Sequence, residues 1–296
     1  MRLGYLTHVT GDDTARAYRR TVELAVRAEE LGYDSFWVAQ HHDGHLGGRL
    51  PSPLVLLAAV AERTRLIRLG TAVALPLEDP NRLSEDAAVL DALSGGRLEL
   101  GIGAGADPGA IRRFGRRFDD RHAYTVAALD VLLAQLPTDL ARQRLWWATG
   151  TARTIDAAAA RGLGVLSDRN PADAPELVGA LERYWTYARG LPRVALSRPL
   201  PVGRTPDELA EDLCADAALP WADEVVVQTG PATVSAEVQR EMLERAARRI
   251  RPRLERPAPA AGTAGFRPTV VGGGVPTPAP WPVPRPVLRT AGRGAG

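Results

Sequence analysis

The sequence has 296 residues, of which 45% are hydrophobic and 24% charged, so it is long and apolar enough to bury one large core. The net charge is +2, but five of the 37 basic residues follow Glu255, where no acidic residue occurs; the preceding part has 32 basic against 35 acidic residues and does not favour nucleic-acid binding. The single cysteine, Cys214, excludes an internal disulfide and is expected to be a small buried residue.

Hydropathy gives no sign of a membrane segment. No apolar run approaches the roughly 18 residues of a spanning helix, and residues 1–6 begin with strand-like sequence rather than a signal peptide. We therefore expect a cytoplasmic protein without a membrane partner.

Short β-like runs alternate with amphipathic helical stretches, which is the pattern of a parallel sheet covered by helices. The runs predicted as strands are residues 2–6, 35–39, 67–74, 98–102, 145–148, 164–166, 194–197 and 224–228. Eight is the strand number of the TIM barrel, so we predict a single (β/α)8 domain over residues 1–254. Its active site is expected at the carboxyl ends of the strands.

The helices between these strands have start signals. Ser52, Asp79 and Thr205 each place an N-cap oxygen before a proline, and Glu208 completes a capping box with Thr205. After residue 254 the helical periodicity disappears. Residues 255–296 are rich in proline, glycine and arginine, and we predict a disordered tail there.

Two adjacent histidines, His41 and His42, follow the second predicted strand. Neighbouring strand residues point to opposite sides, so at most one of them is expected to face the active site. His8, His45 and His122 also lie near predicted strand ends, which leaves a metal site as an alternative. A ligand pair on one strand face is disfavoured, however, and an imidazole titrates near neutral pH, so we predict proton transfer and no metal.

Glycines follow the fourth predicted strand in the run GIGAGA (residues 101–106), which formally fits the dinucleotide fingerprint G-x-G-x-x-G/A. That fingerprint belongs on the first strand–helix turn of its unit, whereas three strand–helix units precede this one. We therefore interpret these glycines as positions where a flat ligand lies close to the backbone.

A third polar motif joins the fifth predicted strand to an alanine-rich helix. Thr149, Gly150, Thr151 and Arg153 combine hydroxyls, a helix N-terminus and a guanidinium, which suits a phosphate. The alternative is an ordinary helix cap with a solvated arginine.

Several segments occur in a linked order: residues 36–42 (FWVAQHH), 51–53 (PSP), 68–76 (RLGTAVALP), 90–97 (LDALSGGR) and 114–115 (FG). In order and spacing they resemble the bacterial luciferase-like family of flavin-dependent monooxygenases over residues 1–135, with weaker similarity up to residue 254. The resemblance implies a two-component enzyme. A separate flavin reductase supplies reduced FMN, which reacts with O2 to give a flavin hydroperoxide that oxidises a small organic substrate.

The resemblance also assigns roles to residues. His41 matches the family's catalytic histidine, with His42 beside it. The Ala72–Val73 bond matches a cis peptide behind the flavin ring, and Gly103 lies where the backbone approaches that ring.

The motif from Thr149 to Arg153 matches the phosphate site. The family is usually dimeric, so a homodimer or a heterodimer with a sister subunit is expected.

The sequence departs from the family pattern at several positions. Gln40 replaces a frequent glutamate before the histidine pair, Ala104 stands where many members carry an arginine, and the connections at residues 136–144 and 199–205 are short. Two alternatives therefore stay open beside the FMN monooxygenase. One is an oxidoreductase that transfers hydride with a deazaflavin coenzyme, and the other is a non-catalytic flavin-binding or partner subunit.

Overall fold

The computed structural model describes residues 1–42, 44, 48–170, 172, 174–201, 203–229 and 235–254. The predicted tail at residues 255–296 and His45 lie outside these described residues.

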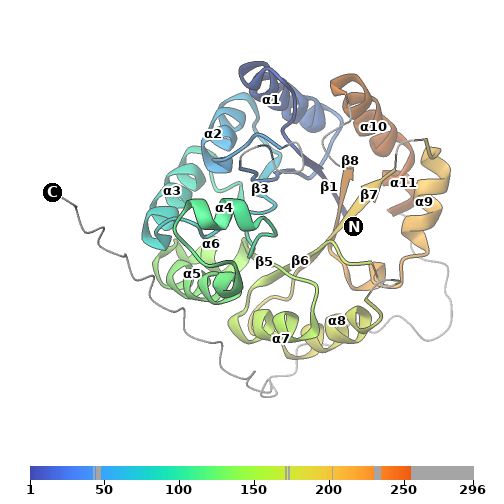
Figure 1. Cartoon of the computed structure of the whole chain (residues 1–296). Coiled ribbons are helices and arrows are strands. Elements are labelled where there is room, and N and C mark those ends of the chain that lie inside the picture. Colours follow the sequence, from blue (N-terminus) through green and yellow to red (C-terminus); the bar gives the residue numbers. More distant parts are fainter. Residues whose placement is uncertain are drawn as a thin grey trace.

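Eight parallel strands form a closed barrel in sequence order, with β1 paired to β8, and helices surround it (Figure 1). The predicted TIM barrel is therefore confirmed. The strands are β1 (Arg2–Thr7), β2 (Ser35–Val38), β3 (Arg68–Thr71), β4 (Leu98–Ile102), β5 (Leu145–Ala148), β6 (Gly164–Ser167), β7 (Val194–Leu200) and β8 (Glu224–Thr229).

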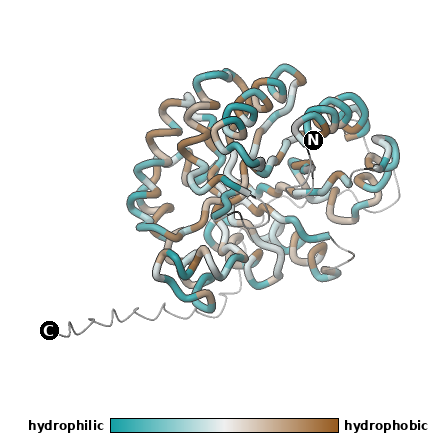
Figure 2. The backbone as a smooth tube through the Cα atoms, turned by 45° about the horizontal axis from the view of Figure 1, so that its top comes forward, coloured by the Kyte–Doolittle hydropathy of each residue, from teal (hydrophilic) through white to brown (hydrophobic). Residues whose placement is uncertain are grey.

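Hydrophilic and hydrophobic residues alternate along the surrounding helices, as expected of amphipathic helices packed on a barrel (Figure 2). Among the described residues, no helix is both long and apolar enough to cross a membrane. The α-helices are α1 (Thr14–Glu30), α2 (Pro53–Arg63), α3 (Pro80–Leu93), α4 (Pro108–Arg113), α5 (Arg121–Gln135), α6 (Thr138–Gln143), α7 (Ala152–Arg161), α8 (Glu176–Tyr187), α9 (Pro206–Cys214), α10 (Ala236–Arg249) and α11 (Arg251–Leu254).

Several local predictions need correction. Strand β3 ends at Thr71 instead of residue 74, directly before a cis peptide bond, and β7 continues to Leu200 because it stays paired with β8. Ser52 precedes α2 as its N-cap residue but makes no capping hydrogen bond, unlike Thr205, whose predicted capping box is present. Cys214 is exposed, because it lies at the end of α9 on the side away from the core.

Two tryptophans pack inside the barrel. Trp37 and Trp146 point inward from β2 and β5 and are fully buried, with their ring centroids 6.1 Å apart. Glycines on neighbouring strands make room for them. A Cβ on Gly164 would lie 2.5 Å from the Trp146 ring, and a Cβ on Gly70 would overlap the Trp37 ring.

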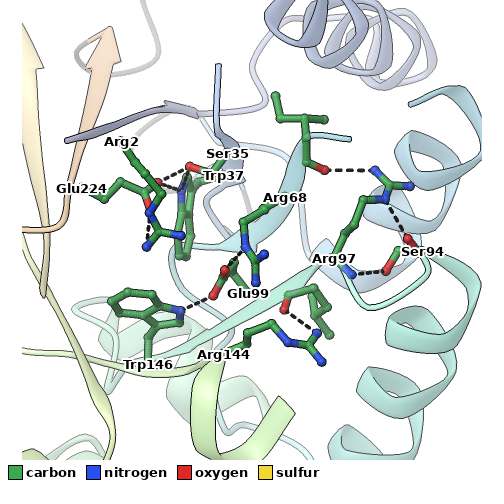
Figure 3. A network of polar contacts seen from close by, with 12 residues as sticks. Arg2, Ser35, Trp37, Arg68, Ser94, Arg97, Glu99, Arg144, Trp146 and Glu224 are labelled. Atoms are coloured by element: carbon green, nitrogen blue, oxygen red, sulfur yellow. Dashed lines mark hydrogen bonds and ion pairs between the residues drawn. The ribbon is translucent and has the colours of Figure 1, made fainter. Parts of the chain in front are cut away.

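A polar network closes the amino-terminal end of the barrel (Figure 3). Buried Glu99 accepts a hydrogen bond from Trp146 Nε1 at 2.6 Å and forms an ion pair with Arg68. Buried Glu224 pairs with Arg2 at 3.1 Å and accepts a hydrogen bond from the Ser35 hydroxyl. Burial raises the pKa of Glu224, although the Arg2 charge opposes this shift. Each buried carboxylate in this network thus has charged and uncharged donors around it.

Candidate active site

Inward side chains alternate along each strand, so the sequence register sets what lies at each height in the barrel. Leu6 on β1, Ala195 on β7 and Val226 on β8 form one buried apolar cluster together with the two tryptophans. Two residues further along the same strands lie His8, Ser197 and Gln228, which line a cavity at the carboxyl end of the barrel. The apolar layer is therefore the floor of the site.

The cavity has a volume of about 610 Å³, within the usual range for small-molecule and cofactor sites. Eight of the ten predicted site residues line it, although they come from three separate segments of the chain. They are Ala72, Val73, Gly103, Ala104, Thr149, Gly150, Thr151 and Arg153. The structure thus brings the predicted cofactor-binding residues together in one place.

The Ala72–Val73 peptide bond is cis, as the resemblance predicts. It follows β3, and its residues contact the loop after β4. A Cβ added to Gly103 would lie 2.6 Å from Val73 Cγ2, so glycine at this position makes room for the valine side chain. The segments after β3 and β4 therefore form one continuous wall of the cavity.

The wall after β5 is basic. Thr151 is the N-cap of α7, and its hydroxyl accepts a hydrogen bond from the Thr154 amide. Arg153 in the first turn, Arg169 after β6 and His122 on α5 line the same part of the cavity. Burial, and then the charges of Arg121 and Arg153, lower the pKa of His122. Since a helix N-terminus and guanidinium groups both attract anions, this end of the cavity fits a phosphate.

The wall formed by β1, β7 and β8 is polar but uncharged. His8 Nε2 lies 3.2 Å from Gln228 Oε1, and because an amide oxygen only accepts, the imidazole donates. Burial lowers the pKa of His8, while the Gln228 hydrogen bond opposes this shift. Ser197 is 5% exposed, and its hydroxyl oxygen has no hydrogen-bond partner among the described residues.

The structure places His41 differently from the sequence prediction. Strand β2 ends at Val38, and the His41 amide donates to Leu50 O at 2.9 Å as the chain turns away. Strand alternation therefore no longer sets its direction, and His41 is not one of the residues that line the cavity. Its ring centroid lies 5.2 Å from that of His8, which does line it.

His42 lies on another side of this turn. It is buried, and its ring contacts Phe114 with the centroids 5.2 Å apart. Gln40 Oε1 accepts from the Leu75 amide, which directs Gln40 Nε2 to the Pro51 carbonyl and to His42 Nε2 at 2.8 Å. The glutamine side chain thus lies within hydrogen-bond distance of His42.

Sequence reasoning missed several polar cavity residues, among them Ser197, Gln228, Asp168 and Arg169. Ser197 and Gln228 are the last residues of two predicted strands, and counting every second residue from the buried positions 195 and 226 would have identified them. Arg169 follows β6 in a loop without a motif. Among the described residues, no group of three or more histidine, cysteine or acidic side chains is placed to hold a metal ion.

The family model for luciferase-like monooxygenases matches residues 1–273. The 4-hydroxyprotoasukamycin monooxygenase of Streptomyces nodosus subsp. asukaensis is 39% identical over 133 residues, covering 45% of this chain and 36% of that protein. The F420-dependent glucose-6-phosphate dehydrogenase of Amycolatopsis mediterranei is 41% identical over 106 residues, covering 34% of this chain and 32% of that protein. The chain thus matches about a third of the length of these curated relatives.

Solved structures share the barrel. The monooxygenase RslO1 from Streptomyces bottropensis superposes with a TM-score of 0.71 at 20% identity, covering 85% of this chain and 99% of that chain. The oxygenating constituent of 3,6-diketocamphane monooxygenase from Pseudomonas putida, a complex with FMN, has a TM-score of 0.55 at 21% identity and covers 72% of this chain and 71% of that one. With a barrel of this architecture and a family match that spans most of its length, the chain belongs to the luciferase-like monooxygenase family.

Proposed function

We propose that the protein is a flavin-dependent monooxygenase that uses reduced FMN supplied by a separate flavin reductase. The observation that carries this proposal is the single cavity in which the predicted cofactor-binding residues meet, with a basic end at the α7 N-terminus. When bound there, reduced flavin supplies the electrons with which O2 is activated and a small organic substrate is oxygenated.

The chain's own residues have distinct tasks in this proposal. Thr149, Gly150, Thr151 and Arg153 hold the phosphate, because the first-turn amides of a helix have no partner inside the helix and a guanidinium adds charge-assisted hydrogen bonds.

The wall made by Ala72, Val73, Gly103 and Ala104 supports the flat ring. The apolar floor below it keeps bulk water away from the reacting atoms.

The proposed proton-transfer residue is His41, which acts from behind the cavity wall. Its ring centroid lies 5.2 Å from that of His8, which lines the cavity, so His41 lies directly behind the cavity wall. His42 is proposed to support this turn through its contacts with Gln40 and Phe114.

A deazaflavin coenzyme in the same cavity is the second candidate. A segment covering 34% of this chain is 41% identical to an F420-dependent dehydrogenase, and this similarity favours the deazaflavin candidate. Anaerobic titration of the full chain with reduced FMN and with reduced deazaflavin separates the two. We expect reduced FMN to bind. Binding of deazaflavin alone would favour the hydride-transfer alternative, and binding of neither would support the non-catalytic alternative.

We also propose that two copies of the chain form a dimer through α2 and α3. Val55, Val89 and Leu93 on these helices are 72%, 60% and 58% exposed beside a groove of about 290 Å³. Arg82 and Asp86 also line the groove, and they form an ion pair with each other on α3.

Light scattering after size exclusion tests the dimer. Val89→Glu should yield a monomer, whereas Leu191→Glu, which alters a comparably exposed side chain at the opposite end of the barrel, should leave the dimer intact. A monomeric wild-type protein would contradict the proposal.

A further inference from the structure

The cavity has two chemically different sides. Arg153 and Arg169 lie on the side of β5 and β6, whereas His8, Ser197 and Gln228 lie on the side of β1, β7 and β8. Strand order in the closed barrel puts β1 across from β5. A phosphate held at α7 therefore leaves the β1–β8–β7 side of the cavity available to bind another group.

This uncharged side offers two hydrogen-bond donors. The Ser197 hydroxyl oxygen is buried without a partner among the described residues. The amide oxygen of Gln228 accepts from His8 Nε2, which turns the amide NH2 group away from the imidazole. Leaving a buried polar group without a partner lowers stability, so the unsatisfied Ser197 hydroxyl in the cavity wall indicates a ligand that satisfies it.

We propose that Ser197 and Gln228 bind the substrate and that they select an uncharged molecule with a hydrogen-bond-accepting oxygen. Both groups donate to such an oxygen. The described cavity residues on this side include no arginine, and Asp168, which directly follows β6, adds a carboxylate to the cavity lining. A carboxylate or sulfonate substrate would be buried on this side without a countercharge, which is unfavourable. The inference rests on the proposed function only in assigning the cofactor to the opposite side.

Ligand-observed NMR on the full chain tests this selection with three probes of similar shape: acetophenone, benzoate and benzenesulfonate. Phosphate buffer occupies the basic side, so that the anionic probes do not simply bind there. The variants are Ser197→Ala, Gln228→Leu and the matched control Gln143→Leu, which removes an amide at the opposite end of the barrel. Circular dichroism and an FMN titration accompany each variant.

We expect acetophenone to bind the wild type more tightly than either anion. Its dissociation constant should rise about three- to tenfold in Ser197→Ala and in Gln228→Leu, as loss of one neutral hydrogen bond predicts, and stay unchanged in Gln143→Leu. Equal acetophenone binding in all variants, or tighter binding of benzoate, would overturn the inference. If FMN fails to bind the wild type while the acetophenone pattern holds, the flavin proposal fails and this inference stands; the reverse result removes this inference alone.

Discussion

The two ends of the barrel differ in what surrounds their buried polar groups. At the amino-terminal end Glu99 and Glu224 are held by arginines, tryptophans and a serine, so each buried charge is compensated (Figure 3). At the carboxyl end Ser197 Oγ and His8 Nδ1 are buried without hydrogen-bond partners among the described residues. The first end is built for stability and the second leaves polar groups for a ligand, a division typical of TIM barrels.

The largest expected effect concerns turnover at the carboxyl end. His41→Ala should keep the fold and most of the FMN affinity while turnover falls about a hundred- to ten-thousandfold, the contribution of a positioned acid–base group. Steady-state kinetics with reductase-supplied FMN measure it. His42→Ala is the matched control and should mainly lower stability, because that ring is buried against Phe114. Unchanged turnover in His41→Ala, or an unfolded variant, contradicts the assignment.

The next prediction compares the two ends directly through urea unfolding. Glu99→Ala should lower the free energy of unfolding by about 3 kcal/mol, because it leaves the Trp146 indole and Arg68 without their buried partner. Loss of one partner of a fully buried ion pair costs up to about 5 kcal/mol, and the lower figure applies here because Arg68 is partly exposed to solvent. Ser197→Ala should change it by less than about 1 kcal/mol, because the lost hydroxyl makes no hydrogen bond with the described residues. Equal losses would erase the distinction between the ends.

Cofactor affinity gives a third test at the basic side of the cavity. Arg153→Ala should weaken FMN binding about tenfold or more, as loss of a charge-assisted hydrogen bond of about 1.5 to 3 kcal/mol predicts. A fluorescence titration measures the dissociation constant. Arg161→Ala changes the same residue type at the other end of α7, where it pairs with Asp130 at 2.9 Å, and should not alter it. Equal affinity in both variants would move the phosphate elsewhere.

The smallest expected effect is a pH dependence. Burial holds the pKa of His8 below its usual value of 6.5, so the unfolded chain binds this proton more tightly than the folded one. The contribution of neutral, buried His8 to the free energy of unfolding is therefore fully present above pH 6.5 and declines as pH falls below that value. His8→Gln should make the free energy of unfolding less dependent on pH between about 5 and 7. An identical slope in the variant would show that His8 does not titrate on unfolding.

Sequence periodicity was sufficient for the barrel but not for the direction of individual loops. The strand runs and the cap at Thr205 are local properties, and they appear in the structure at the expected places, although the ends of β3 and β7 differ from the prediction. The exposed position of Cys214 and the turn that carries His41 away from the cavity depend on how the chain packs beyond a strand or helix end. Local patterns do not encode those contacts.

The candidate site shows the same limit. Motifs at positions 72–73, 103–104 and 149–153 predicted residues that the fold brings to one cavity. His8 was recognised near a strand end, yet its neighbours Ser197 and Gln228 belong to no motif. They meet His8 only because β8 pairs with both β1 and β7 when the barrel closes.

The central claim is that the cavity at the carboxyl end of the strands holds FMN with its phosphate at the start of α7. A crystal structure of the full chain grown with FMN tests it most directly. The account predicts phosphate oxygens within hydrogen-bond distance of the α7 first-turn amides and the Arg153 guanidinium, with the flavin ring against Val73 and Gly103. FMN bound with its phosphate on the side of Ser197 and Gln228, or bound outside this cavity, would contradict it.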